Sequence, residues 1–339
     1  MFHQRVAPAS AAIPSPGRIE GIEALRGIAA TAVVLCHAAR HVDEAFGAPA
    51  LLRLFQPGHS GVDLFFVLSG FIILLVHRRD VGRPERLARY AWRRFVRVWP
   101  LYWLALGATL AVSVAGGHAP PGLGTLGWNL TLLPTAGEPI LGIAWTLQYE
   151  ALFYLLFGVL LIERRLGIVA LAGWLALVML GLASGWQAGV ATGIFAIEFF
   201  MGMAAATIVR RDLVPRPRWL AVGGGLLFAF AWSAEAVGVL DGYGIVARLA
   251  YGLPSAIVVA AVAAWKPGVP RLIAGLGASS YATYLFHLLG IGVAWQVLGR
   301  LGVVMPAGAW FVVLAGSGIA AGLVMHRVAE RPILARFRR

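Results

Sequence analysis

Ionisable side chains stand inside four strongly apolar stretches of this sequence. His37 ends the run LRGIAATAVVLCH, Asp63 lies in GVDLFFVLSGF, Glu150 in WTLQYEALFY, and His287 in SSYATYLFH. An ionisable group inside a membrane is costly unless it is paired or hydrated, which makes each of these residues a candidate for function. An imidazole and a carboxylate form a natural acid and base pair, so the residue types predict proton transfer.

A structural role is the alternative for each of these residues, because single polar side chains also hydrogen-bond between membrane helices. For His287 and Ser69 we keep the structural and the functional role side by side. Asp63 could pair with a helix end or a neighbouring Arg. We predict that His37, Glu150 and Asp63 are catalytic, with one of the two carboxylates orienting the imidazole. A further buried carboxylate, in the stretch AIEFFMGM, is expected to pair structurally.

Basic side chains form a second group. Arg26 precedes His37 by eleven positions in the same apolar stretch, and RRDVGRPERLARYAWRRFVRVWP (residues 78–100) contains eight Arg. Four of them recur every three or four residues, which places them on one helical face. They are Arg86, Arg89, Arg93 and Arg97. This face suits either anionic lipid headgroups or, because guanidinium binds phosphate in bidentate geometry, a phosphate-bearing cofactor.

Composition defines the class of protein that must position these residues. The chain is 60% hydrophobic and only 13% charged, which is typical of an integral membrane protein. A span needs about 20 apolar residues. This rule predicts an all-α bundle of ten transmembrane helices near 21–39, 60–77, 98–116, 145–162, 166–184, 191–209, 219–238, 245–264, 273–297 and 307–325.

Charge distribution predicts the orientation of this bundle. With a cytoplasmic N-terminus, 23 of the 28 Lys and Arg fall on the cytoplasmic side, which places both termini there by the positive-inside rule. The net charge of +13 is therefore topogenic and does not indicate nucleic-acid binding. A single Cys excludes an internal disulfide, and the sequence predicts no metal site.

Domain organisation follows from the same pattern. Residues 1–18 are rich in Pro and Ala and are predicted to be a disordered cytoplasmic tail without a signal peptide. One transmembrane domain is expected over 19–333, followed by a basic cytoplasmic tail at 334–339.

Depth in the membrane connects the two groups of residues. In the predicted orientation His37, Asp63, Glu150 and His287 reach similar depths on four different helices. Arg26 lies about 16 Å nearer the cytoplasm than His37, at 1.5 Å per residue.

Several of these stretches, taken in order, resemble one family. LRGIAATAVVLCH, GVDLFFVLSGFII, RRFVRVWPLYW, WTLQYEALFYLLF, SSYATYLFH and AERP are together similar to the acyltransferase-3 family of membrane acyltransferases, and WTLQYE resembles its exopolysaccharide-acetylating branch. The resemblance implies O-acyl transfer from cytoplasmic acyl-coenzyme A, here acetyl-CoA, to a hydroxyl of a cell-envelope or secreted glycan. It also implies residence in the bacterial inner membrane.

The same resemblance implies roles for the candidate residues. The family's pattern of Arg, ten residues and His falls on Arg26 and His37, the latter being the residue on which transfer depends. A phosphate-rich donor would anchor at the cytoplasmic side while its pantetheine arm reaches the imidazole. The residues predicted to contact this donor are Arg26, Arg93, Arg94, Arg97, Ser69, Tyr281 and His287.

The sequence leaves open how His37 acts and how the acceptor is reached, and it allows two other classes of protein. His37 could act as a general base or carry the acyl group itself. No hydrolase-like domain follows the last helix, so the acceptor is lipid-linked, reaches the outer mouth directly, or is served by a separate polysaccharide assembly protein. A proton-coupled transporter would also concentrate such residues, but the inverted repeats typical of transporters are not detected. A non-catalytic export or assembly partner is the third class.

Overall fold

The computed structural model describes residues 20–133 and 138–337, and every regular element in these ranges is a helix. Ten helical segments in the described ranges are long and apolar enough to cross a membrane, as the hydropathy pattern predicts. Their main helices are α1 (Glu20–Phe46), α3 (Gly61–His77), α4 (Leu87–Ala115), α6 (Trp145–Ile162), α7 (Arg164–Ser184), α8 (Ala196–Arg210), α9 (Pro217–Ala236), α10 (Ile245–Trp265), α12 (Ser280–Arg300) and α13 (Ala307–Met325). The predicted tail over residues 1–18 lies outside the described residues.

Shorter helices connect or extend these spans. They are α2 (Pro49–Phe55), α5 (Leu123–Thr131), α11 (Arg271–Ala278) and α14 (Arg331–Arg336). A π-helical stretch, His326–Glu330, joins α13 to α14. The beginning of the predicted basic tail at 334–339 is thus helical up to residue 336.

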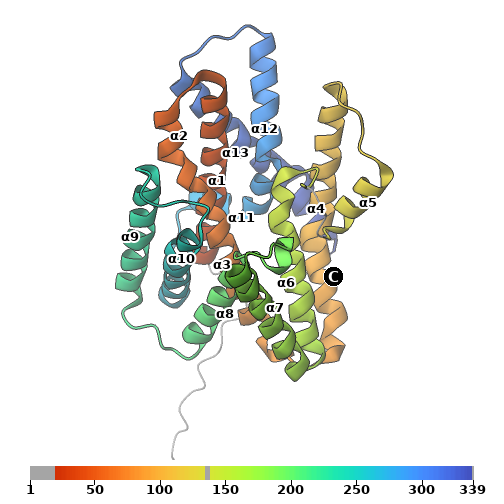
Figure 1. The fold of residues 1–339 in the computed structure, drawn as a ribbon, viewed down its shortest axis with the longest axis vertical. Helices are drawn as coiled ribbons and strands as arrows, with labels where there is room; N and C mark the ends of the chain where they lie inside the picture. Colours follow the sequence, from red (N-terminus) through yellow and green to blue (C-terminus); the bar gives the residue numbers. More distant parts are fainter. Residues whose placement is uncertain (1–19, 134–137, 338–339) are drawn as a thin grey trace, which may run out of the picture.

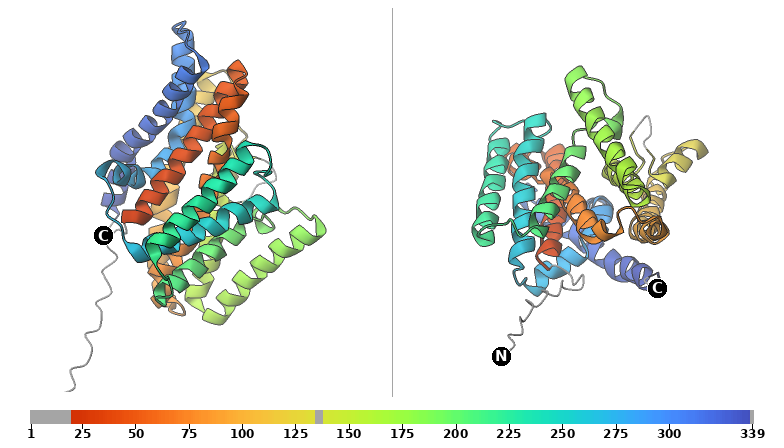
Figure 2. Two further views of the ribbon diagram at one scale, coloured as in Figure 1. Left: turned by 90° about the vertical axis from the view of Figure 1, so that its left-hand side faces the viewer. Right: turned by 90° about the horizontal axis from the view of Figure 1, so that it is seen from below.

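Helix α1 occupies the centre of the bundle. It packs against α3, α10, α12 and α13, with α11 across its first turns. Figure 1 shows α9 and α10 on one side of α1 and α4, α5 and α6 on the other, and Figure 2 shows α1 running beside the α9 and α10 pair. A side chain on α1 can therefore meet partners from several helices.

The arginine-rich segment is part of a membrane helix and does not form a separate surface helix. Helix α4 begins at Leu87, well before the predicted start near residue 98, and continues through Pro100. The hydropathy rule misses its first turns because they carry Arg, although Arg is a good helix former. Arg94 and Arg97, near the end of this segment, are half-buried, whereas the five preceding arginines are exposed: Arg79, Arg83, Arg86, Arg89 and Arg93.

The predicted span 273–297 is divided into α11 and α12 at Ser279. The division accompanies a close approach of two backbones: a Cβ atom added at Gly277 would lie 2.3 Å from the carbonyl oxygen of Glu23. Helix α11 therefore packs directly on the first turns of α1, and α12 continues in a new direction along the bundle.

Helices α6 and α7 are joined by one residue. Glu163 accepts hydrogen bonds from the backbone N–H groups of Arg165, at 2.9 Å, and Leu166, at 2.5 Å, and so caps the start of α7. These hydrogen bonds hold the pKa of the exposed Glu163 carboxyl below its usual value.

Helices α3 and α8 touch through glycine. A Cβ atom added at Gly202 would lie 2.0 Å from the carbonyl oxygen of Val67, so no larger residue fits there without moving the backbone. We expect Gly202→Ala to lower the unfolding free energy by about 1–3 kcal/mol, measured as resistance to unfolding in detergent. Gly107→Ala is the matched control, because nothing lies within 4 Å of the added Cβ atom and the substitution favours a helix. Equal stability of the two variants would contradict this prediction.

Candidate active site

A cavity lies between α3, α4, α6 and α12, and α1 contributes Arg26 to its wall. The empty space between its lining side chains, counted together with the open solvent at its mouth, is about 720 Å³. Phenylalanine and aliphatic side chains of α3 form much of the wall, while α4, α6 and α12 supply most of its polar groups. The cavity is thus an apolar space with polar groups at defined levels, as ligand sites commonly are.

Three guanidinium groups line the cavity at the arginine-rich end of the bundle. They belong to Arg26, Arg94 and Arg97. The guanidinium carbon of Arg94 lies 5.6 Å from the ring centroid of Tyr154, and that of Arg97 lies 5.1 Å from the ring centroid of Tyr281. The Nε atom of Arg94 is buried without a hydrogen-bond partner among the described residues. This end of the cavity therefore suits an anionic ligand.

Arg97 is fixed by a carboxylate to which the sequence assigned no role. Its Nη1 donates to Oε1 of Glu330 at 2.5 Å, and Nδ1 of His326 lies 2.7 Å from the other oxygen of Glu330. Glu330 is buried and lies in the π-helical stretch, within the AERP motif. The carboxyl end of the chain thus holds one of the three cavity arginines in position.

Glu150 occupies the middle of the cavity. Ser69 donates from Oγ to Oε1 of Glu150 at 3.2 Å, and the hydroxyl of Tyr154 donates to the same oxygen. Because both hydrogen bonds end on one oxygen, the carboxylate keeps capacity to accept from a molecule in the cavity. Farther along, the hydroxyl oxygens of Thr146 and Tyr284 are 2.7 Å apart.

Two histidines meet beyond the Tyr284 end of the cavity. Nε2 of His287 lies 3.2 Å from Nδ1 of His37, and the ring centroids are 4.9 Å apart. His287 is fully buried and His37 is partly exposed. His37 does not line the cavity itself. Tyr284 does line it, and its ring centroid lies 6.1 Å from that of His287, so Tyr284 stands at the boundary between the cavity and the histidine pair.

One face of α12 follows this whole series of polar groups. Tyr281, Tyr284 and His287 follow one another at intervals of three residues, and Ser280 precedes Tyr284 by four, which keeps all four on one side of the helix. The contacts are Ser280 with Arg26, Tyr281 with Arg97, Tyr284 with Thr146, and His287 with His37. A single helix therefore links the arginine-rich end of the cavity to the imidazole of His37.

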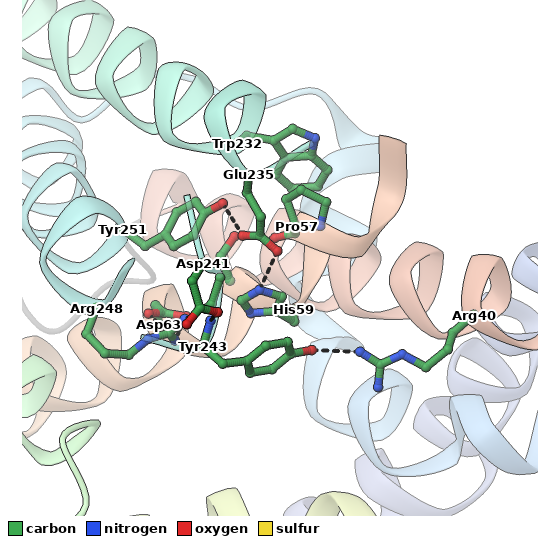
Figure 3. A network of polar contacts seen from close by, with 12 residues as sticks. Arg40, Pro57, His59, Asp63, Trp232, Glu235, Asp241, Tyr243, Arg248 and Tyr251 are labelled. Atoms are coloured by element: carbon green, nitrogen blue, oxygen red, sulfur yellow. Dashed lines mark hydrogen bonds and ion pairs between the residues drawn. The ribbon is translucent and has the colours of Figure 1, made fainter. Parts of the chain in front are cut away.

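Asp63 belongs to a different cluster, shown in Figure 3. Nη1 of Arg248 donates to both carboxylate oxygens of Asp63, at 2.5 and 2.6 Å, and the Arg248 Nη2 donates to the carbonyl oxygen of Gly242. The side chains of Arg248 and Asp63 are 1% and 0% exposed. Glu198 of α8 is also buried and interacts electrostatically with both members of the pair. Asp63 thus has the structural partner that the sequence left open.

The structure differs from the prediction that a carboxylate orients His37. The described hydrogen-bond partners of its ring are the carbonyl oxygen of Val33 and the ring of His287. Glu150 is bonded to Ser69 and Tyr154 in the cavity, and Asp63 is paired with Arg248. The partner of His37 is therefore a second imidazole.

The predicted donor-contacting residues divide into three groups. Five of them line the cavity: Arg26, Arg94, Arg97, Ser69 and Tyr281. Arg93 is exposed and is not part of the wall, and His287 contacts His37. No group of three or more His, Cys, Asp or Glu that could hold a metal ion occurs within residues 20–133 and 138–337.

Four functional or structural partners were missed from the sequence: Tyr154, Thr146, Arg248 and Glu330. Arg248 carried a usable signal, since a guanidinium in an otherwise apolar helix requires a counter-charge and Asp63 and Glu198 were available. Tyr154 and Thr146 lie one turn from Glu150, on either side of it along α6, so they share its face.

Comparison with known sequences defines the class of protein. The acyltransferase domain of the acyltransferase-3 family matches residues 19–327, nearly the whole chain. The chain therefore belongs to this family, and the protein is an integral membrane O-acyltransferase. The family resemblance inferred from the sequence motifs is confirmed.

Two relatives are similar over nearly their full length. The exopolysaccharide production protein ExoZ of Rhizobium meliloti strain 1021 is 33% identical over 302 residues, which cover 84% of this chain and 92% of the relative. The acyltransferase MdmB of Streptomyces mycarofaciens is 27% identical over 369 residues, covering 95% of this chain and 93% of the relative. No solved structure matches the chain.

Proposed function

We propose that this protein transfers an acetyl group from cytoplasmic acetyl-CoA to a hydroxyl of an exopolysaccharide at the bacterial inner membrane. The observation that carries the proposal is the series of contacts along α12, from the guanidinium groups of Arg26 and Arg97 at one end to the His37 imidazole at the other. The similarity to ExoZ supports a polysaccharide as the acceptor.

The donor enters from the arginine-rich side. Under the positive-inside rule this side is cytoplasmic, and the proposal places both termini there. The even number of candidate spans among the described residues supports this orientation. Arg26, Arg94 and Arg97 bind the phosphates, because charged nucleotide cannot enter the hydrocarbon cheaply. The slim pantetheine arm passes Ser69 and Glu150, whose oxygens can accept from its amide N–H groups.

The chemistry is proton transfer coupled to acyl transfer. His37 takes the proton from the acceptor hydroxyl while the hydroxyl oxygen attacks the thioester carbonyl of acetyl-CoA. The C–O ester bond forms and the C–S bond breaks. His37 then returns the proton to the thiolate of coenzyme A. Atoms and charge balance without a further reactant. An acyl-histidine intermediate is the alternative, and rapid quenching with radiolabelled acetyl-CoA in the absence of acceptor tests it, since direct transfer leaves no label on the protein.

The acceptor approaches from the opposite side. His37 lies in the second half of α1, eleven residues after Arg26, and its side chain is partly exposed. A glycan or lipid-linked glycan reaching this end would place its hydroxyl at the imidazole, and polysaccharide assembly proteins would deliver or remove it.

The function is tested with purified protein in vesicles. Acetyl-CoA is supplied on one side and deacetylated exopolysaccharide from the host on the other, and O-acetyl groups on the polysaccharide are measured by NMR. Acetylation that depends on both substrates is expected. Hydrolysis of acetyl-CoA without modified polysaccharide would refute the proposed acceptor, and no consumption of acetyl-CoA would refute the proposed donor.

Arg94 provides the sharpest test of donor binding. Loss of one charge-assisted hydrogen bond costs about 1.5–3 kcal/mol, so Arg94→Gln should raise KM for acetyl-CoA by about 10- to 100-fold. The control is Arg93→Gln, because Arg93 is the adjacent residue but is exposed and lies outside the cavity wall. The two variants carry the same net charge, so equal KM values would show that only the general basic surface matters.

A further inference from the structure

We propose that His287 is a positioning residue that sets the tautomer of His37, taking the place that a carboxylate holds in other histidine-based sites. This inference rests on the proposed function, in which His37 handles the proton. It assigns His287 a role distinct from donor binding.

The hydrogen bonds of His287 determine which of its nitrogens carries hydrogen. Its Nδ1 lies 2.7 Å from the carbonyl oxygen of Tyr284 and 3.2 Å from that of Thr283. A carbonyl oxygen can only accept, so Nδ1 of His287 must donate. In the neutral ring, Nε2 of His287 therefore has a lone pair, and this atom faces His37.

The same reasoning then applies to His37. Its Nδ1 lies 2.9 Å from the carbonyl oxygen of Val33 and 3.2 Å from Nε2 of His287. Both neighbours are acceptors, so Nδ1 of His37 carries hydrogen and shares it between them. The lone pair of neutral His37 is consequently on Nε2, the nitrogen left for the acceptor hydroxyl.

The chain of hydrogen bonds also fits the charged state formed during transfer. When Nε2 of His37 takes a proton, the Nδ1–H group stays bonded to His287, whose lone pair helps to stabilise the imidazolium. His287 itself remains neutral, because a second positive charge beside the first in a buried site would be costly. Two neutral imidazoles and three carbonyl oxygens thus avoid the burial of an additional carboxylate.

The test compares two substitutions of His287. His287→Leu has similar volume but no acceptor, and we expect kcat to fall by about 10- to 100-fold while KM for acetyl-CoA is unchanged. This loss is smaller than the roughly 10,000-fold effect of a wrong tautomer in serine proteases, because the Val33 carbonyl still accepts from His37. His287→Gln presents an amide oxygen near the former Nε2 and should recover part of kcat.

A spectroscopic measurement separates positioning from general packing. In ¹⁵N-histidine NMR spectra, assigned with a His37→Gln sample, neutral His37 should carry hydrogen on Nδ1 alone, and His287→Leu should give a mixture of tautomers. Detergent unfolding identifies variants that simply fail to fold. If His287→Leu is one of them, the tautomer of neutral His37 in the wild-type NMR spectrum tests the proposal instead.

The outcomes distinguish this inference from the proposed function. If His37→Ala is inactive while His287→Leu keeps the wild-type kcat, or if neutral His37 carries hydrogen on Nε2, only the role of His287 is overturned. If His37→Ala is active, the proposed use of His37 fails as well.

Discussion

Replacing His37 by alanine is expected to lower kcat for acetyl transfer by about 100- to 10,000-fold, the usual contribution of a general base. Affinity for acetyl-CoA should not change, because Arg26, the α1 residue proposed to bind its phosphates, lies about 16 Å away along this helix. The other two proposed phosphate ligands, Arg94 and Arg97, belong to α4. Turnover is measured in vesicles with acetyl-CoA and polysaccharide, and donor affinity by titration calorimetry of the purified protein.

His41 supplies the matched control for this experiment. It lies one turn farther along α1, and its ring packs edge-on against Trp295 with centroids 4.9 Å apart. His41→Ala removes an imidazole from the same helix and should retain most of the activity. Wild-type turnover in His37→Ala, or an equal loss in both variants, would contradict the assignment of the base to His37.

The helices of this protein could be predicted because the membrane imposes one simple requirement. A spanning segment must bury its backbone polar groups in a helix and present apolar side chains to lipid, so hydropathy alone identifies ten spans. The rule fails where a helix leaves the hydrocarbon. The first turns of α4 are rich in Arg and fall outside the span predicted from hydropathy, although they continue into it without a break.

The site was predicted by residue type and depth, but depth does not determine direction around the bundle. His37, Asp63, Glu150 and His287 were placed at one level, yet only His37 and His287 touch. Each helix presents a given residue to one neighbour, and which neighbour depends on packing that one sequence does not reveal.

The arginines near the cavity also show that one sequence does not reveal which face of a helix meets its neighbours. Helical periodicity grouped Arg93 with Arg97 on one face, whereas the cavity wall contains Arg94 and Arg97 and leaves Arg93 exposed. Arg93 precedes Arg97 by four residues and Arg94 precedes it by three, so both are neighbours of Arg97 on the helix surface. The position of the adjacent helices decides which of the two joins Arg97 in the cavity wall.

Arg248→Met is expected to destabilise the protein by about 3–5 kcal/mol, the cost of leaving a buried charge without its partner. Arg248 is the counter-ion of Asp63, with Glu198 close to both, and it also binds the carbonyl oxygen of Gly242. Removal of the guanidinium leaves two carboxyl groups in a fully buried space. The free energy of unfolding is measured in mixed detergent micelles by titration with a denaturing detergent.

A second substitution identifies the electrostatic origin of this loss. Asp63→Asn combined with Arg248→Met removes both members of the ion pair, and the double variant should be more stable than Arg248→Met alone, because no unpaired Asp63 charge remains. Arg300→Met, at the exposed end of α12, is the control for removing an arginine and should be close to wild type. If Arg248→Met were as stable as Arg300→Met, the pair would contribute nothing to folding, and the burial of Asp63 would need another explanation, such as a direct part in catalysis.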